Sequence, residues 1–229
     1  MMDRISELKI EAYEEKLKGV DYQMQYFKLQ VEPHFYLNCL KCLYAMAENQ
    51  DYEKMQKMIL GMSKCLRSIT YDNRATTTVE KELEYVSNYL DIRQLGMADP
   101  PECRLSLDYR ARECAIPMLC IQTFVENSIK YAGKENGRLI IQIDVSLREE
   151  PRCLRIVVKD NGEGYPDSVL EELCNNGALS APGHIGLSNL WNRLRLIYDG
   201  RATMNMTNLP EGGARSELLI PLDSTLPNA

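Results

Sequence analysis

The residues Asp160-Asn161-Gly162-Glu163-Gly164 place one carboxylate two residues before a pair of glycines. A carboxylate accepts hydrogen bonds from an amino group such as that of a purine, and glycines let the backbone bend closely around a base. The mostly apolar residues 154–159 before this motif predict a buried strand that ends at Asp160. The motif indicates a nucleotide site, although many surface turns contain the same pattern.

Two further segments strengthen this interpretation. Residues 122–132 have a helical pattern in which apolar side chains face a core while Glu126 and Asn127 stand side by side. Residues 183–190 contain glycines and lead into a helical segment, and backbone N–H groups at a helix start can meet phosphate. The order and spacing of the three segments resemble the N, G1 and G2 boxes of the Bergerat ATP-binding fold, shared by histidine kinases, Hsp90, type II topoisomerases and MutL.

A fourth segment selects one branch of that group, because only a histidine kinase needs a phosphate-accepting histidine. Residues 29–38 resemble the phosphoacceptor box of the LytS/YesM-type sensor histidine kinases, and the matching residues are Gln30, Pro33, His34, Phe35 and Asn38. The resemblance covers about residues 25–221. Its supporting matches are Leu83, Tyr89, Leu90, Ile116-Pro117, Gly212-Gly213 and Leu219-Ile220-Pro221.

This resemblance implies an α+β chain with two parts. Residues 1–97 are expected to form a helical hairpin for dimerisation and histidine phosphotransfer, and residues 98–229 a Bergerat-type α/β sandwich with a mixed sheet that binds ATP. The run Ala98-Asp99-Pro100-Pro101-Glu102 breaks the helical pattern and marks the expected boundary.

The helices and strands that must position these residues follow from periodicity. Helices are predicted at 3–50 and 52–96, and the heptad-like stripe Leu17, Val20, Met24, Phe27 and Val31 predicts a dimeric bundle. After residue 98 the pattern predicts strands at 104–109, 139–147, 154–160, 202–207 and 216–221, and helices at 118–132, 168–174 and 185–198. The helices are expected on one face of the sheet, and residues 175–182 occupy the position of the ATP lid.

The resemblance also implies roles for single residues. His34 is the expected nucleophile, grouped with Asn38 and Glu126 as the catalytic set, because a neutral imidazole has a free lone pair that can accept a phosphoryl group. Glu126 is expected to act as general base or to orient water or Asn127, and the sequence leaves these roles open. Asn127 is the expected Mg²⁺ ligand.

The remaining expected contacts are to the nucleotide itself. Asp160 accepts from the adenine amine while Gly162 and Gly164 bring the chain close to the base. The residues expected near phosphate or ribose are Lys130, Tyr131, Gly183, Gly186 and Leu187. His184 stands where the family frequently has glycine, and it is either a plain loop residue or a phosphate contact. Gly96 stands where many relatives carry arginine.

Composition narrows the classes of binding partner that the chain is expected to have. A formal net charge of -6 argues against a general surface for nucleic acid or acidic membrane, whereas ATP with Mg²⁺ is neutralised locally. The eight cysteines, including Cys39 and Cys42, lack disulfide or zinc spacing and are expected to be reduced thiols in a cytoplasmic protein. No run of 18 or more apolar residues is present, so a membrane is expected only through a missing N-terminal sensor region.

The predicted function is therefore a two-component histidine kinase core. It is expected to be a homodimer that phosphorylates His34 with ATP and passes the phosphoryl group to an aspartate in the receiver domain of a response regulator. One alternative is a catalytically silent, nucleotide-binding scaffold, against which the joint presence of His34, Glu126, Asn127 and Asp160 argues. The other is a Bergerat-type ATPase or anti-sigma serine kinase, which would not need the helical module before residue 97.

Overall fold

The computed structural model describes residues 33–71, 75–97, 99–131, 137–176 and 185–222. Met1–Pro33 and His34–Ala229 separate into two units. The predicted dimer stripe from Leu17 to Val31 lies outside the described residues, and so do Gly183, His184 and residues 177–182 of the expected lid.

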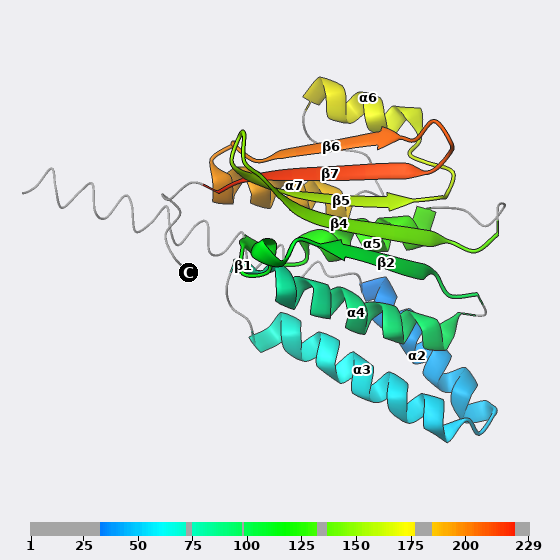
Figure 1. The fold of residues 1–229 in the computed structure, drawn as a ribbon. Helices are drawn as coiled ribbons and strands as arrows, with labels where there is room; N and C mark the ends of the chain where they lie inside the picture. Colours follow the sequence, from blue (N-terminus) through cyan, green and yellow to red (C-terminus); the bar gives the residue numbers. More distant parts are fainter. Residues whose placement is uncertain (1–32, 72–74, 98, 132–136, 177–184, 223–229) are drawn as a thin grey trace, which may run out of the picture. The chain divides into compact units, whose positions relative to one another are not determined.

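The first described part is helical. Helices α2 (Pro33–Glu48), α3 (Tyr52–Tyr71) and α4 (Val79–Gly96) lie together (Figure 1), and their buried apolar side chains belong to a core that continues into the sheet region. Apolar side chains spaced three and four residues apart build this core, and its most buried members include Phe35, Met58, Val86, Tyr89 and Ile92. Gly61 and Gly96 allow close packing, because an added Cβ would lie 2.8 Å from Ile92 Cγ1 and from Cys42 Sγ, respectively.

The single helix predicted for residues 52–96 is wrong. Strand β1 (Thr76–Thr78) separates α3 from α4 and pairs antiparallel with β3 (Ala115–Pro117). Three consecutive β-branched threonines favour an extended chain, and the Thr78 hydroxyl then caps α4 by accepting from the N–H of Lys81 at 3.3 Å. This pairing fastens the start of α4 to the segment that precedes helix α5 (Cys120–Tyr131).

A five-stranded mixed sheet forms the second described part. Its order is β2 (Glu102–Leu107), β4 (Ile140–Arg148), β5 (Cys153–Asp160), β7 (Ala214–Pro221) and β6 (Thr203–Asn208). Strands β2 and β4 are parallel and the other neighbours are antiparallel. Burial alternates residue by residue along β7, as the period of a strand with one covered face requires.

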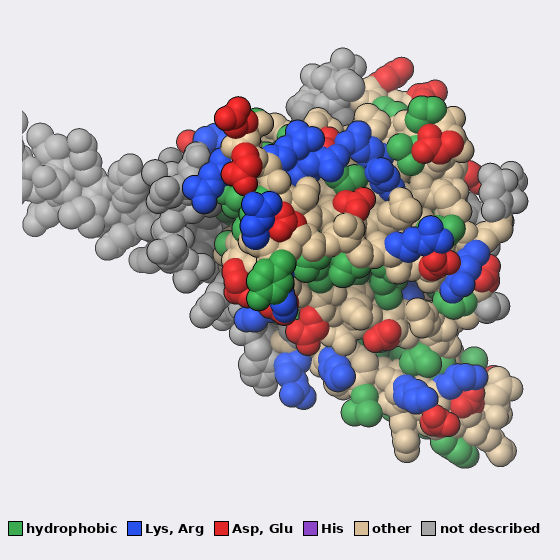
Figure 2. Space-filling view, viewed as in Figure 1, with side chains coloured by type: hydrophobic (Ala, Val, Ile, Leu, Met, Phe, Trp, Pro, Cys, Tyr) green, Lys and Arg blue, Asp and Glu red, His purple; other side chains and the backbone are tan. Residues whose placement is uncertain are grey.

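Helices cover one face of this sheet. Helices α5 and α7 (Ile185–Tyr198) lie behind it in Figure 1, while α6 (Asp167–Asn176) lies beside β6 and the short 3₁₀ helix η1 (Tyr109–Ala111) follows β2. On the open face, basic and acidic side chains are interspersed (Figure 2), and Glu217 pairs with Arg155 at 2.6 Å and Arg215 at 3.0 Å. The α+β class with helices on one face is confirmed.

Most predicted elements of the sheet region exist within a few residues of their expected ends, and α7 has the predicted bounds. The differences have local causes. Tyr109, expected to end a strand, begins η1, and Asn175 and Asn176, expected in the lid, end α6. The described cysteines, Cys39, Cys42, Cys65, Cys103, Cys114, Cys120 and Cys153, are free thiols. No helix in the described ranges has the length and hydropathy to cross a membrane.

Candidate active site

Asp160 is the last residue of β5 and is buried, with 7% of its surface exposed. Its Oδ2 accepts a hydrogen bond of 2.7 Å from the Ser128 hydroxyl of α5. Its Oδ1 accepts from the backbone N–H groups of Gly162 at 3.0 Å and of Ala214 at 3.2 Å. Three donors fix the orientation of this carboxylate, and a buried acceptor of this kind discriminates in favour of ligands that offer a matching donor.

The glycines around Asp160 are required by close backbone packing. Gly164 has a φ of +89°, and an added Cβ would lie 2.6 Å from Asn208 Oδ1. Asn208 holds the loop after Asp160 in place, because it accepts from the Tyr165 N–H at 2.6 Å and donates to the Tyr165 carbonyl at 2.9 Å. At Gly213, with a φ of +97°, a Cβ would lie 1.9 Å from the Asp160 carbonyl oxygen.

Helix α5 presents Glu126 and Asn127 in fixed orientations. Glu126 Oε1 accepts a hydrogen bond of 2.7 Å from Gln122 Nε2, one turn earlier. Asn127 Nδ2 donates to the Thr123 carbonyl oxygen at 2.8 Å. Both side chains are only partly buried, so they combine a fixed position with access to solvent or ligand.

The hydrogen bond from Asn127 to Thr123 determines which Asn127 atom is available to a magnesium ion. Donation by the Asn127 amide nitrogen leaves the amide oxygen to face a ligand, and a single neutral oxygen suits Mg²⁺, which keeps waters and substrate phosphates as its other ligands. Within the described ranges no three His, Cys, Asp or Glu side chains gather into a metal-binding cluster. The donor set therefore fits a magnesium ion carried mainly by a nucleotide.

Tyr36 lies on α2 two residues after His34 and is partly buried. Burial, followed by the charges of Cys65, Cys39 and Glu126, raises the pKa of Tyr36 to about 12. The side chain of His34 itself lies outside the described part of the chain.

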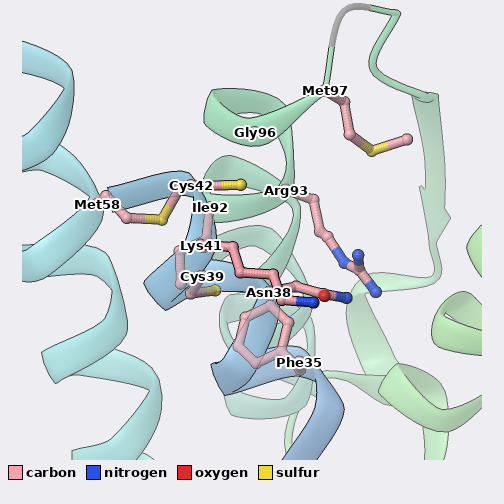
Figure 3. A pocket seen from close by; sticks show the side chains of 10 residues that line it. All are labelled: Phe35, Asn38, Cys39, Lys41, Cys42, Met58, Ile92, Arg93, Gly96 and Met97. Carbon is pink, nitrogen blue, oxygen red and sulfur yellow. The ribbon is translucent and has the colours of Figure 1, made fainter. Parts of the chain in front are cut away.

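Phe35, the residue after His34, is buried against α4. Its ring centroid lies 5.1 Å from that of Tyr89 and 5.5 Å from the Arg93 guanidinium, and Arg93 Nε donates to the Tyr89 hydroxyl at 2.9 Å. Beside it, a cavity of about 320 Å³ opens between α2, α3 and α4 (Figure 3). Asn38 lines this cavity together with Phe35, Cys39, Lys41, Cys42, Met58, Ile92, Arg93, Gly96 and Met97.

The remaining predicted residues lie at helix ends. Lys130 and Tyr131 end α5, with the Lys130 ammonium 5.0 Å from the Tyr131 ring centroid. Gly186 is the second residue of α7 and lies beside α5, where an added Cβ would lie 3.5 Å from Thr123 Cγ2. Leu187 has a fully buried side chain, so only its backbone is left to meet a phosphate.

The structure therefore brings together the boxes on α5, β5 and the start of α7. Sequence reasoning missed several residues of this arrangement. Ser128 directly follows the Glu126-Asn127 pair, and Gly213 belongs to a recognised glycine pair, so both had a signal nearby. Asn208 had none, because its role depends on contacts 43 residues away along the chain.

Two protein-family models match this chain. Residues 22–100 match the model of the family described as histidine kinase, and residues 116–224 match the family of histidine kinase-, DNA gyrase B- and HSP90-like ATPases. A histidine kinase domain of a blue-light activated histidine kinase from Erythrobacter litoralis aligns with a TM-score of 0.47 and 17% identity, covering 90% of this chain and 96% of that one.

Two curated relatives match over most of this chain. The sensor histidine kinase YesM of Bacillus subtilis is 27% identical over 96% of this chain and 37% of its own length. The sensor protein LytS of Staphylococcus epidermidis is 31% identical over 90% of this chain and 34% of its own length. The chain thus spans about a third of the length of these relatives. With both family regions present in this order and with these relatives matching over most of its length, the chain belongs to the histidine kinases of the LytS and YesM type.

Proposed function

We propose that this chain uses ATP and Mg²⁺ to phosphorylate His34 and then passes the phosphoryl group to an aspartate of a response regulator. The observation that carries the proposal is the arrangement on α5. Glu126 and Asn127 share this helix with Ser128, whose hydroxyl donates to the buried Asp160 carboxylate at 2.7 Å.

In the proposed reaction, a neutral His34 imidazole attacks the γ-phosphorus with its unprotonated nitrogen. The N–P bond forms while the bond from the γ-phosphorus to the bridging oxygen of the β-phosphate breaks, and ADP leaves. The proton of the other ring nitrogen is released, and we assign its acceptance to Glu126. In the second reaction a carboxylate oxygen of the receiver-domain aspartate bonds to the phosphorus while the N–P bond breaks, and the leaving ring nitrogen takes a proton from water, which restores the neutral histidine.

The nucleotide is held by the residues around β5 and α5. Asp160 accepts a hydrogen bond from the adenine amine. The Gly162–Gly164 loop passes beside the base, and Asn208 keeps this loop in its turn conformation. Asn127 offers its amide oxygen to Mg²⁺, which neutralises phosphate charge. Lys130, Tyr131 and the backbone at Gly186 and Leu187 border the phosphates and ribose. Gly183 and His184 remain predictions, because they lie outside the described residues.

We also propose that the chain is a homodimer, with residues 1–97 as the helical phosphotransfer region and 98–229 as the ATP-binding region. Support comes from α2 and α3, which expose large apolar side chains at helical spacing: Leu37, Leu40 and Tyr44 on α2, and Tyr52, Ile59 and Leu66 on α3. A second copy would cover such stripes. The cytoplasmic location expected from the sequence stays a prediction.

The proposal is tested by incubating the protein with γ-labelled ATP and Mg²⁺. We expect a label that is acid-labile and stable in alkali, as phosphohistidine is. The variant His34→Gln should carry no such label while it binds ATP and dimerises as the unmodified chain does. An acid-labile label that persists on this variant would leave His184 as the acceptor, because the chain has two histidines.

A mixing experiment then separates the two routes of transfer. His34→Gln subunits bind ATP, and Asp160→Asn subunits still offer a histidine. Heterodimers regain label when transfer runs between subunits, and they stay unlabelled when it runs within one subunit.

A further inference from the structure

Glu82 is a fully buried carboxylate on α4, with 0% of its surface exposed, and it faces the start of α5. It accepts hydrogen bonds from the backbone N–H groups of Leu119 at 2.8 Å, Ile121 at 3.1 Å and Gln122 at 3.2 Å. The first N–H groups of a helix have no partner within the helix and carry partial positive charge. Glu82 satisfies these groups from another helix, so it fastens the N-terminus of α5 to α4.

Arg193 also holds this segment, and its charge acts on Glu82. This α7 residue is 6% exposed, and its Nη1 donates to the Met118 carbonyl oxygen at 2.6 Å. Between the two contacts, Leu119 adopts a φ of 63°, a left-handed conformation that is unfavourable for a branched side chain. Such a residue persists only where its surroundings hold it firmly. The geometry at the start of α5 is therefore set by α4 and α7 together.

Further hydrogen bonds connect the start of α5, which Glu82 holds, to the candidate site residues. Gln122, whose N–H binds Glu82, donates its side-chain Nε2 to Glu126 Oε1 at 2.7 Å. Thr123, the next residue, accepts from Asn127 with its carbonyl oxygen and donates its hydroxyl to the Leu119 carbonyl oxygen at 2.6 Å. Glu126 and Asn127 are both hydrogen-bonded to the turn of α5 that Glu82 holds.

The other end of the same α4 face packs on the phosphoacceptor helix. Tyr89 and Arg93 follow Glu82 by about two and three helical turns, so the three side chains share one side of α4. Tyr89 and Arg93 contact Phe35, which directly follows His34. A helix rises 1.5 Å per residue, so Tyr89 and Arg93 lie about 10 Å and about 16 Å along α4 from Glu82, the residue that contacts α5.

We propose that Glu82 and Gln122 are positioning residues for phosphoryl transfer. Glu82 sets the position of α5 relative to the helix that supports Phe35, and Gln122 transmits that position to the Glu126 carboxylate. The inference rests on the proposed histidine kinase activity, and it adds that Glu126 is effective only while this chain of hydrogen bonds is intact.

Gln122→Leu is the first test, because it removes the donor to Glu126 and retains a side chain of similar size. We expect the rate of His34 labelling at saturating ATP to fall about tenfold or more, as for the loss of one hydrogen bond to a charged group. The ATP concentration for half-maximal rate should change less than about twofold, because none of the hydrogen bonds at Asp160 involves Gln122. A merely structural role would weaken ATP binding as well.

Glu82→Gln tests the contact between Glu82 and the start of α5. The amide oxygen of Gln can still accept from Ile121 and Gln122, which share one carboxylate oxygen of Glu82, but its NH2 group would face the Leu119 N–H. Hydrogen exchange at the Leu119 amide should therefore become faster without nucleotide, and labelling should slow several-fold at saturating ATP. Glu84→Gln, a matched change at an exposed position of α4, should alter neither quantity.

The outcomes distinguish the positioning role of Glu82 and Gln122 from the proposed histidine kinase activity. Normal labelling rates in both Gln122→Leu and Glu82→Gln would overturn the positioning role while the histidine kinase activity stands. Equal losses of rate and of ATP affinity would also overturn it, since they would indicate general damage to the fold. An unmodified chain that acquires no acid-labile label would overturn the proposed activity itself.

Discussion

Asp160, at the end of β5, is enclosed by three hydrogen-bond donors, whereas Asn38, on α2, lines an open cavity of the helical region. The two regions around these residues also differ in how much of their apolar surface is covered. The sheet region buries one face of its strands under α5 and α7. Helices α2 and α3 leave large apolar side chains such as Leu40 and Tyr44 more than half exposed, and apolar side chains also appear at that end of the molecule in Figure 2.

This difference indicates how each region is completed. Around Asp160 the sheet region supplies its own packing and, together with the contact of Glu82 to α5, fixes the geometry within one chain. The helical region exposes apolar surface that a further surface must cover, which we propose to be a second copy. The two regions should therefore respond differently to substitution: the first through folding and ATP affinity, the second through assembly.

The largest effect is expected from Gly213→Ala. Its Cβ would lie 1.9 Å from the Asp160 carbonyl oxygen, so strand β5 or β7 must shift, and we expect a loss of at least about 3 kcal/mol in the free energy of unfolding. Gly212→Ala is the matched control, because Gly212 has a similar φ of +94° and no atom within 4 Å of an added Cβ. It should cost about 1 kcal/mol. Urea denaturation measures both, and equal losses would contradict the crowding argument.

Asp160→Asn is expected to weaken ATP binding by about 10- to 100-fold. The amide nitrogen of Asn brings a donor toward Ser128 or toward the N–H groups of Gly162 and Ala214, and it removes a charged acceptor for the adenine amine. Titration calorimetry gives the affinity. Asp144→Asn, on β4 opposite Val157, is the control and should bind ATP as before. Unchanged affinity in the Asp160 variant would make Asp160 a turn residue only.

Leu40→Glu tests the proposed assembly. Leu40 on α2 and Leu105 on β2 are both 55% exposed, so the same substitution at each site has a similar cost within one chain. We expect Leu40→Glu to raise the dimer dissociation constant at least about tenfold, because a charge would enter an apolar interface. Leu105→Glu should leave it unchanged. Sedimentation equilibrium measures the constant, and equal behaviour of the two variants would exclude the α2 stripe from the interface.

The smallest effect concerns pH. Burial raises the pKa of Glu82 to about 7, although its three backbone donors and the charge of Arg193 lower it. Cys120 on α5 is the other titratable group that faces it. A carboxyl with a raised pKa binds its proton more tightly when folded, so it stabilises the fold at low pH and this contribution is lost as pH rises through about 7.

We expect the free energy of unfolding to fall between pH 5 and 7 by at most about 1 kcal/mol per pH unit from this group. Glu82→Gln should remove that slope, and Glu84→Gln should keep it. Denaturant titrations at several pH values measure the slope. A Glu82→Gln variant with an unchanged slope would assign the pH dependence to other groups.

Local pattern was sufficient for much of the sheet region. Alternation over 216–221 and the apolar run ending at Asp160 gave the strands, and the spacing of Leu187, Leu190 and Leu194 gave α7. These signals are reliable because each element packs one face on the core and repeats its period along the chain. The Glu126-Asn127 pair was found for the same reason, as a polar interruption of an apolar helix.

Contacts between distant segments had no such signal. The helical pattern is interrupted at β1 because this strand pairs with Ala115–Pro117. The helix predicted over 52–96 was wrong because local propensity contains no information about a strand partner elsewhere in the chain. Glu82 did interrupt the apolar stripe of α4, but its partners lie 37 to 40 residues away.

By itself, the sequence determined the order of the boxes, the α+β class and the residue types able to bind ATP and carry a phosphoryl group, because these are read from short segments. Tertiary structure alone decided which groups meet: Asp160 with Ser128 and Ala214, Gly213 with the Asp160 carbonyl, and Glu82 with the start of α5. These contacts join segments that only the packing of the sheet and helices brings within hydrogen-bond distance.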